Sequence, residues 1–197
     1  MGGVALTKTE IISTALGILD AYGLNDLTMR RLADSLDVKA SALYWHVANK
    51  QSLLAELVDQ ILAGLEPPEL DAAADGDPWR SSLRGWATEL RARLLDHRDS
   101  ADLVASMRAI GLAGTELSRA PAAVLTAMGM ADQEATTASQ TLIYFILGHV
   151  DEEQQRAQLG ALAGEASPTP AMDGTASFAA GLNLIFDGMA AALPHDD

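Results

Sequence analysis

The sequence predicts an all-α fold, and three features carry this prediction. Apolar residues recur at helical spacing through most of the chain, as in the inward stripe Ile12, Ala15, Leu19 and Tyr22. Capping residues precede these runs, and glycine or proline follows them. No segment alternates convincingly between apolar and polar residues, as a half-buried strand would. The chain is therefore expected to bury its core between helices alone.

The first 66 residues are expected to form four helices. These cover about 8–22, a stretch that begins after Thr28, 40–46 and 50–65. A capping box of Thr7 and Glu10 begins the first helix, and Gly23 ends it. Thr28 and Asn49 are the N-caps of the second and fourth. The inward faces are predicted to hold Leu32, Ala33, Leu36, Leu43, Val47, Leu53, Leu54, Leu57, Val58, Ile61 and Leu62.

A second set of helices is expected after a break at Glu66-Pro67-Pro68, because proline cannot continue a helix. Residues 69–77 are loop-like, and Asp77-Pro78 is a start signal. The helices that follow are expected at 78–97, 101–112, 115–129, 133–163 and 174–192, with a loop at 164–173. This organisation divides the chain into residues 1–66 and residues 67–197.

Composition excludes several classes of protein. There is no cysteine, so disulfides, thiolate metal sites and a cysteine nucleophile are ruled out. No apolar run is long enough to span a membrane, and no signal peptide is evident, so a cytoplasmic protein is expected. The net charge is −14, but residues 1–66 carry only −3 of it. A DNA-binding function in those residues is therefore not excluded by the total charge.

The stretch Leu27 to Lys50 carries the clearest functional pattern. A short helix, a turn at 37–39 and a second short helix form the geometry that places a helix in the major groove of DNA. The second helix carries Tyr44, Trp45 and His46, whose polar atoms and rings suit phosphates and thymine methyls. These rings could instead pack between the first and fourth helices, but three successive positions point about 100° apart.

The same stretch, L-T-M-R-R-L-A-D-S-L-D-V-K-A-S-A-L-Y-W-H-V-A-N-K, resembles the DNA-binding signature of the tetracycline-repressor (TetR) family of transcription regulators. Weaker similarity continues around Trp79, 94–99, 147–150 and 178–182. The resemblance implies an N-terminal three-helix DNA-binding domain with a helix-turn-helix, and a larger C-terminal helical domain for dimerisation and ligand binding. It implies double-stranded operator DNA, a second copy of the chain and a small-molecule effector as partners.

The resemblance also implies which residues contact operator DNA. Thr28 and Lys39 lie in the same motif and are added as candidates. The expected set is Thr28, Met29, Arg30, Lys39, Ala40, Ser41, Tyr44, Trp45, His46 and Lys50. Arg30 is favoured for phosphate or base contact, and Arg31 for solvent. Ala40 and Ser41 cannot make the bidentate amide contact that reads adenine. The binding mode is therefore carried over, and the operator sequence is not.

Dimer and effector residues are expected in the C-terminal domain. The last two long helices offer an apolar face for a two-fold dimer, made of Phe145, Ile146, Phe178, Gly181, Leu182, Ile185 and Met189. The same residues could be ordinary core. Family resemblance places the effector among Trp86, Leu90, Val104, Met107, Arg108, Met128 and Met130. A stripe of Met or Trp residues could equally be core.

Two departures from the tetracycline repressors argue against a metal–tetracycline effector. Val104 stands where those proteins hold a metal-binding histidine, and Trp86 and Leu90 replace their drug-contacting asparagine and phenylalanine. A more apolar or aromatic effector is expected. His149, Glu152 and Glu153 have metal-ligand spacing, but a solvated helix end explains them better. No metal and no cofactor are expected.

The leading hypothesis is a ligand-responsive dimeric repressor released from its operator by the effector. An activator, or a regulator without an effector, is an alternative. A helical protein-interaction module with vestigial DNA heads is another. An enzyme is not expected, since the sequence lacks G-x-S-x-G, a phosphate loop and H-E-x-x-H.

Overall fold

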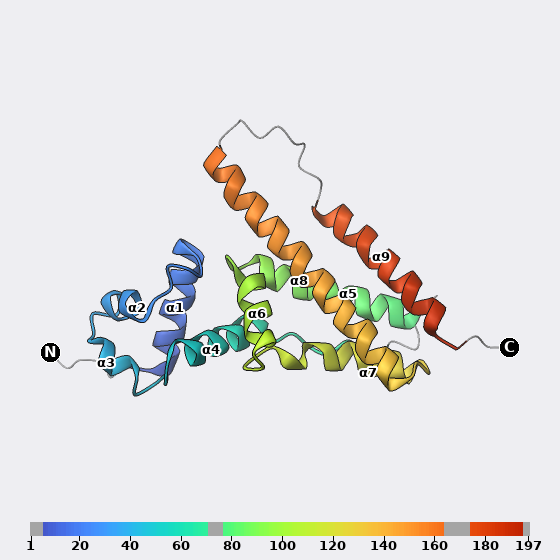
Figure 1. The fold of residues 1–197 in the computed structure, drawn as a ribbon, viewed down its shortest axis with the longest axis horizontal. Coiled ribbons are helices and arrows are strands. Elements are labelled where there is room, and N and C mark those ends of the chain that lie inside the picture. Colours follow the sequence, from blue (N-terminus) through green and yellow to red (C-terminus); the bar gives the residue numbers. More distant parts are fainter. Residues whose placement is uncertain (1–5, 71–76, 164–173, 195–197) are drawn as a thin grey trace. The chain divides into compact units, whose positions relative to one another are not determined.

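The computed structural model describes residues 6–70, 77–163 and 174–194. Within these residues the chain is helical and contains no strand (Figure 1). The prediction of an all-α fold is confirmed. The helices are α1 (Lys8–Tyr22), α2 (Met29–Ser35), α3 (Ala40–Leu43), α4 (Lys50–Leu62), α5 (Pro78–Leu95), α6 (Ser100–Ala109), a 3₁₀ turn (Thr115–Ser118), α7 (Arg119–Ala127), α8 (Asp132–Ala163) and α9 (Gly174–Ala192).

Contacts divide the chain into two compact units. The first contains residues 1–63 and 93–115, and the second contains residues 64–92 and 116–197. Helix α5 passes from the second unit into the first at Arg93. The boundary at residue 66, expected from the sequence, stays a prediction. The predicted loop at 164–173 lies outside the described residues.

The first unit packs α1 to α4 and α6 around one apolar core. Thr7 and Glu10 form the predicted capping box at the start of α1, and Asn49 caps α4 through Ser52 N at 2.9 Å. The core side chains, at most 8% exposed, are Ile11, Ile12, Ala15, Ile18, Leu19, Leu27, Leu32, Ala33, Leu43, Val47, Leu53, Leu54, Leu57, Val58 and Ile61. Helix α4 packs on α6.

The second unit is built on the long helix α8, which packs against α7 and α9. Figure 1 shows α9, in red, beside part of α8. Trp79 of α5 meets Phe186 of α9 edge to face, with ring centroids 5.8 Å apart. A methyl group at Gly181 of α9 would lie 2.3 Å from Phe145 Cζ of α8. The missing side chain therefore lets the Phe145 ring lie directly on α9.

Several helix ends differ from the sequence prediction, for reasons of backbone conformation. Helix α4 ends at Leu62 rather than 65, because Gly64 adopts φ +74°. Helix α5 ends at Leu95 rather than 97, because the chain turns into a corner where Asp99 adopts φ +53°. The predicted helix at 115–129 begins as a 3₁₀ turn and ends at Ala127, ahead of Gly129 with φ +90°.

One predicted side-chain position in the first unit was also wrong. Tyr22, assigned to the inward stripe of α1, is 54% exposed, and the Arg31 guanidinium lies over its ring at 4.4 Å. Ile11 and Ile18 are buried instead and were not assigned to that stripe. Among the described residues, no helix is long and apolar enough to cross a membrane.

Substitution Gly181→Ala should destabilise the second unit by about 1–3 kcal/mol, because the new methyl group would overlap the Phe145 ring. Gly17→Ala is the control, since Gly17 lies inside α1 and a methyl group there would meet no atom within 4 Å. That change should stabilise by about 0.5–1 kcal/mol, because alanine favours the helix. Urea denaturation measures both. Equal effects of the two substitutions would contradict the close contact between Phe145 and α9.

Candidate DNA-binding surface and effector region

Helices α2 and α3 are held by a short turn with a buried apolar base. The Thr28 hydroxyl accepts from Arg31 N at 3.1 Å and caps α2. Asp37 adopts φ +53°, and Val38 N donates to Ala33 O at 3.0 Å. Leu43 is fully buried beneath α3. The outward faces of α2 and α3 are thus left free of core packing.

Helix α3 is shorter than predicted. The α-helix ends at Leu43, and Tyr44 to His46 form a turn instead of extending it to residue 46. His46 N and Val47 N both donate to Leu43 O at 2.9 Å. Leu43 O thus accepts a tight three-residue bond as well as the four-residue bond of an α-helix. The turn also buries Val47 in the core.

The three rings of this turn lie at the surface. Tyr44 is 52% exposed, Trp45 is 89% exposed, and His46 is also exposed. They do not pack between α1 and α4, which was the alternative interpretation. An indole this exposed gives no stability to the subunit by burial. The turn therefore presents three ring side chains to a partner.

Arg30 and Arg31 have different surroundings although they are neighbours. The Arg31 Nη2 donates to Asp26 Oδ1 at 2.9 Å, and its guanidinium covers the Tyr22 ring. The Arg30 side chain is 92% exposed, with only a loose 3.9 Å approach of Nε to Asp34. Arg30 thus has its donors available for phosphate. Lys39 precedes α3 and is exposed, and Lys50 is the first residue of α4.

The remaining candidates of the DNA surface offer few hydrogen-bonding groups. Ala40 and Ser41 are exposed at the start of α3, and Met29 is half-buried at the start of α2. The Thr28 hydroxyl oxygen is engaged in the cap. Of these four, only Thr28 and Ser41 carry a hydroxyl, and the Thr28 oxygen already accepts from Arg31 N. The surface is richer in groups for phosphate than in groups for bases.

The residues predicted to line an effector site fall in both units. Trp86, Leu90, Met128 and Met130 belong to the second unit, and Val104, Met107 and Arg108 belong to the first. All are buried except Met128 and Arg108, which are half-buried. Arg108 Nη1 donates to Gly114 O at 2.6 Å. The Arg108 guanidinium therefore holds the loop that follows α6.

An open cleft of about 460 Å³ lies in the second unit, and it shares only Trp86 with the predicted effector residues. Pro67, Pro68 and the start of α5 form its walls. Glu66, Glu69 and Glu89 also line it. The cleft is thus more acidic than the apolar site expected from the sequence.

Most of the residues predicted for a dimer interface lie in the subunit's own core. Ile146, Phe178, Leu182 and Met189 are at most 4% exposed. Phe145 packs on Gly181 and stacks on Phe178 at 5.5 Å. Ile185 is half-buried. Their role in a dimer stays a prediction, and their burial favours the core interpretation that the sequence left open.

Two family profiles match the chain. "Bacterial regulatory proteins, tetR family" matches residues 11–57, and "Tetracyclin repressor-like, C-terminal domain" matches residues 72–163. The class A tetracycline repressor from transposon 1721 of Escherichia coli is 34% identical over 199 residues, which cover 94% of this chain and 91% of that repressor. The chain belongs to the TetR family. The resemblance predicted from the sequence is confirmed.

Solved structures of TetR-family proteins agree with this assignment over the whole length. BioQ of Mycobacterium smegmatis is 39% identical, covers 95% of this chain and 99% of its own, and superposes with a TM-score of 0.83. A BioQ bound to its double-stranded DNA operator is 37% identical over 94% of this chain and 99% of its own, with a TM-score of 0.78. This TetR-family chain is thus a helix-turn-helix, DNA-binding regulator of transcription.

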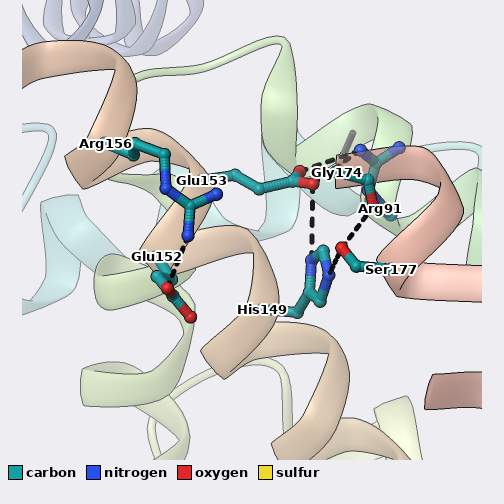
Figure 2. Close-up of polar contacts among 7 residues, drawn as sticks. All are labelled: Arg91, His149, Glu152, Glu153, Arg156, Gly174 and Ser177. Carbon is teal, nitrogen blue, oxygen red and sulfur yellow. Dashed lines mark hydrogen bonds and ion pairs between the residues drawn. The ribbon is translucent and has the colours of Figure 1, made fainter. Parts of the chain in front are cut away.

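His149 and Glu153 do not lie at a solvated helix end, contrary to the prediction from the sequence. Their side chains are only 14% and 12% exposed. Glu153 is bound by Arg91 of α5, whereas Glu152 is exposed and pairs with Arg156 (Figure 2). Within the described residues, no group of three His, Cys, Asp or Glu side chains could hold a metal ion.

Sequence reasoning did not single out Arg91, Ser177 or Gly174, which surround the His149–Glu153 pair. One signal was present. Arg80, Arg84 and Arg91 recur at intervals of four and seven residues, and therefore lie on one face of α5. The partners of that face on α8 and α9 lie 60 or more residues away in the sequence, so spacing alone could not name them.

Substitution Arg30→Gln should weaken operator binding and reduce the slope of log affinity against log salt by about 1, because one phosphate contact is lost. Arg31→Gln is the matched control and should change the slope little, since Arg31 is held by Asp26. Fluorescence anisotropy with operator DNA at several salt concentrations measures both. A larger change of slope for Arg31→Gln would overturn this assignment.

Proposed function

We propose that this TetR-family protein is a dimeric transcriptional repressor that binds a palindromic operator and is released by a small effector. The turn Tyr44 to His46 is the observation that carries the proposal. Its three rings are exposed while Leu43 and Val47 anchor it in the core. Exposed rings on an anchored turn can stabilise a complex with a partner, whereas they contribute little to the stability of the fold. The operator complex of a BioQ with the same fold supports DNA as that partner.

On DNA, some of the exposed groups would position the protein on the phosphate backbone, and others would read the base sequence. Arg30, Lys50, Tyr44 and His46 would contact phosphates, and the first turn of α4 would add the partial positive charge of a helix N-terminus. Met29, Ala40 and Ser41 would face base edges. Since these three offer little hydrogen bonding, apolar contact with thymine methyls and DNA shape would supply much of the specificity.

The dimer would form through the outward face of α8 and α9. That face carries Tyr144, 66% exposed, and Leu184, 76% exposed. Gly148 and Gly188 lie one helical turn further along on the same faces, with no atom within 4 Å of the place a Cβ would occupy. Large exposed side chains next to glycines allow the α8–α9 pairs of two subunits to pack closely against each other. This face replaces the buried residues as the surface available to a second copy.

Effector release would pass through the first unit. Val104 and Met107 lie on α6, and α6 packs directly on α4. A ligand that displaced α6 would therefore move α4, which begins at Lys50 beside the ring turn. The ligand must bind the displaced state more tightly than the DNA-bound state. The buried Val104 and Met107 favour an apolar or aromatic effector, and Val104 offers no ligand to a chelated metal.

The whole proposal is tested with DNA from upstream of the chain's own gene. A gel shift should show a complex that saturates at two subunits per site and weakens steeply with salt. Salt-insensitive or undetectable binding would favour the protein-interaction alternative. Transcription from a reporter carrying that DNA should fall when the protein is expressed. A rise in transcription would identify an activator.

Substitution Leu184→Asp should abolish or greatly weaken the dimer without unfolding the subunit, because the side chain is 76% exposed and would place a charge in the interface. Ile110→Asp is the control, since Ile110 is 55% exposed and lies in the first unit. Sedimentation equilibrium measures the subunit dissociation constant. An increase of about 100-fold is expected for Leu184→Asp, equal to roughly 3 kcal/mol. A dimer insensitive to Leu184→Asp would contradict this interface.

A further inference from the structure

Three arginines of α5 are arranged along α9. Arg80 Nη1 lies 2.8 Å from Asp187 Oδ1, and Arg84 Nη2 donates to Asn183 Oδ1 at 2.6 Å. Because the earlier arginine meets the later residue of α9, the two helices run in opposite directions. Arg91 continues the series and lies over the Phe178 ring at 5.2 Å. The series ends at the first turn of α9.

The Arg91 contact is the buried one of the three. Its Nη2 lies 2.9 Å from both carboxylate oxygens of Glu153 on α8 (Figure 2). The side chains of Arg91 and Glu153 are 14% and 12% exposed, whereas Asp187 is 69% exposed. A charge at this depth depends on its partner far more than one at the surface. Three helices therefore meet at one carboxylate.

His149 holds the same carboxylate from a second side. His149 Nε2 lies 3.0 Å from the Ser177 hydroxyl oxygen, which lies 3.2 Å from Gly174 O. With its proton on Nδ1, a neutral imidazole turns that N–H toward Glu153 and accepts from the Ser177 hydroxyl through Nε2. His149 Nδ1 then faces Glu153 Oε1 at 3.4 Å. The imidazole thus links Glu153 to the first turn of α9 through Ser177.

Gly174 leaves room for this arrangement. It is the first residue of α9, and a Cβ there would lie 1.8 Å from Glu153 Oε1. Any other residue at this position would displace the carboxylate. The carboxylate lies against the start of α9, where the helix dipole favours a negative charge. Arg91, His149 and Gly174 together determine where α9 begins.

We propose that Glu153, held by Arg91 and His149, is a positioning residue for subunit association. It fixes the start of α9 and thereby the orientation of the outward face that carries Leu184. The inference rests on the proposed dimer through α8 and α9. Because Arg91 follows Leu90 on α5, the contact also joins the helix of the expected effector site to the helix of the expected interface.

A charge-removal cycle tests the positioning role. The variants are Arg91→Gln, Glu153→Gln and the double substitution, with Arg80→Gln as a matched control at the exposed end of the same helix pair. Sedimentation equilibrium gives the dimer dissociation constant of each. Each single change at the buried pair should raise it by on the order of tenfold, and the double change should recover most of the loss. Arg80→Gln should raise it less than about threefold.

A second pair of variants keeps the test decisive if a charge variant fails to fold. Gly174→Ala should weaken the dimer in the native background, because the methyl group displaces the carboxylate. In a Glu153→Ala background the same change should be neutral or favourable, since the space is then empty. Hydrogen exchange of the first turns of α9 should be faster in Gly174→Ala, with exchange in α1 to α4 unchanged.

The outcomes separate this inference from the proposed function. A wild-type dimer with equal responses to Arg91→Gln and Arg80→Gln, or with no dependence of Gly174→Ala on Glu153, overturns the positioning role alone. A wild-type protein that stays monomeric at all concentrations overturns both the positioning role and the proposed dimer. A weakened dimer that the double substitution restores supports both.

Discussion

The second unit depends on the burial of one carboxylate. Glu153 lies among α5, α8 and α9, where water cannot solvate its charge fully, and Arg91, His149 and the start of α9 compensate for the loss. Apolar packing of Phe145, Phe178 and their neighbours would tolerate several relative shifts of the helices. The ion pair tolerates few, because its distances are short and its partners lie on three elements.

The first unit follows the opposite design. Its apolar core is complete beneath α2 and α3, so several residues above it are not needed for packing. Trp45 and Arg30 are almost wholly exposed, and neither is needed for the fold. A surface of this kind can change its DNA preference by substitution at little cost in stability. Packing and recognition are thus assigned to different residues of the same short segment.

The sequence predicted the helices of the first unit well because the signals there are local. Thr7, Thr28 and Asn49 each cap the helix that their position indicated, and Leu43 and Val47 are buried as expected. The end of α3 was missed, because a tight turn and an α-helical turn place similar residues inward. The direction in which Tyr22 points was also missed, since Arg31 and Tyr22 meet only after the chain folds.

By itself, the sequence determined the helical class and the family, because periodicity, caps and the signature are properties of neighbours in the chain. Its residues for DNA contact stay a prediction. Only the tertiary structure decided which apolar residues of α8 and α9 face inward. It moved Ile146 and Phe178 into the core and left Tyr144 and Leu184 outside. It also paired Arg91 with Glu153, 62 residues apart. From the sequence, a wide apolar stripe can face several neighbouring helices, and a charged residue can pair with several distant residues. Only the packing of the helices determines which of these contacts form.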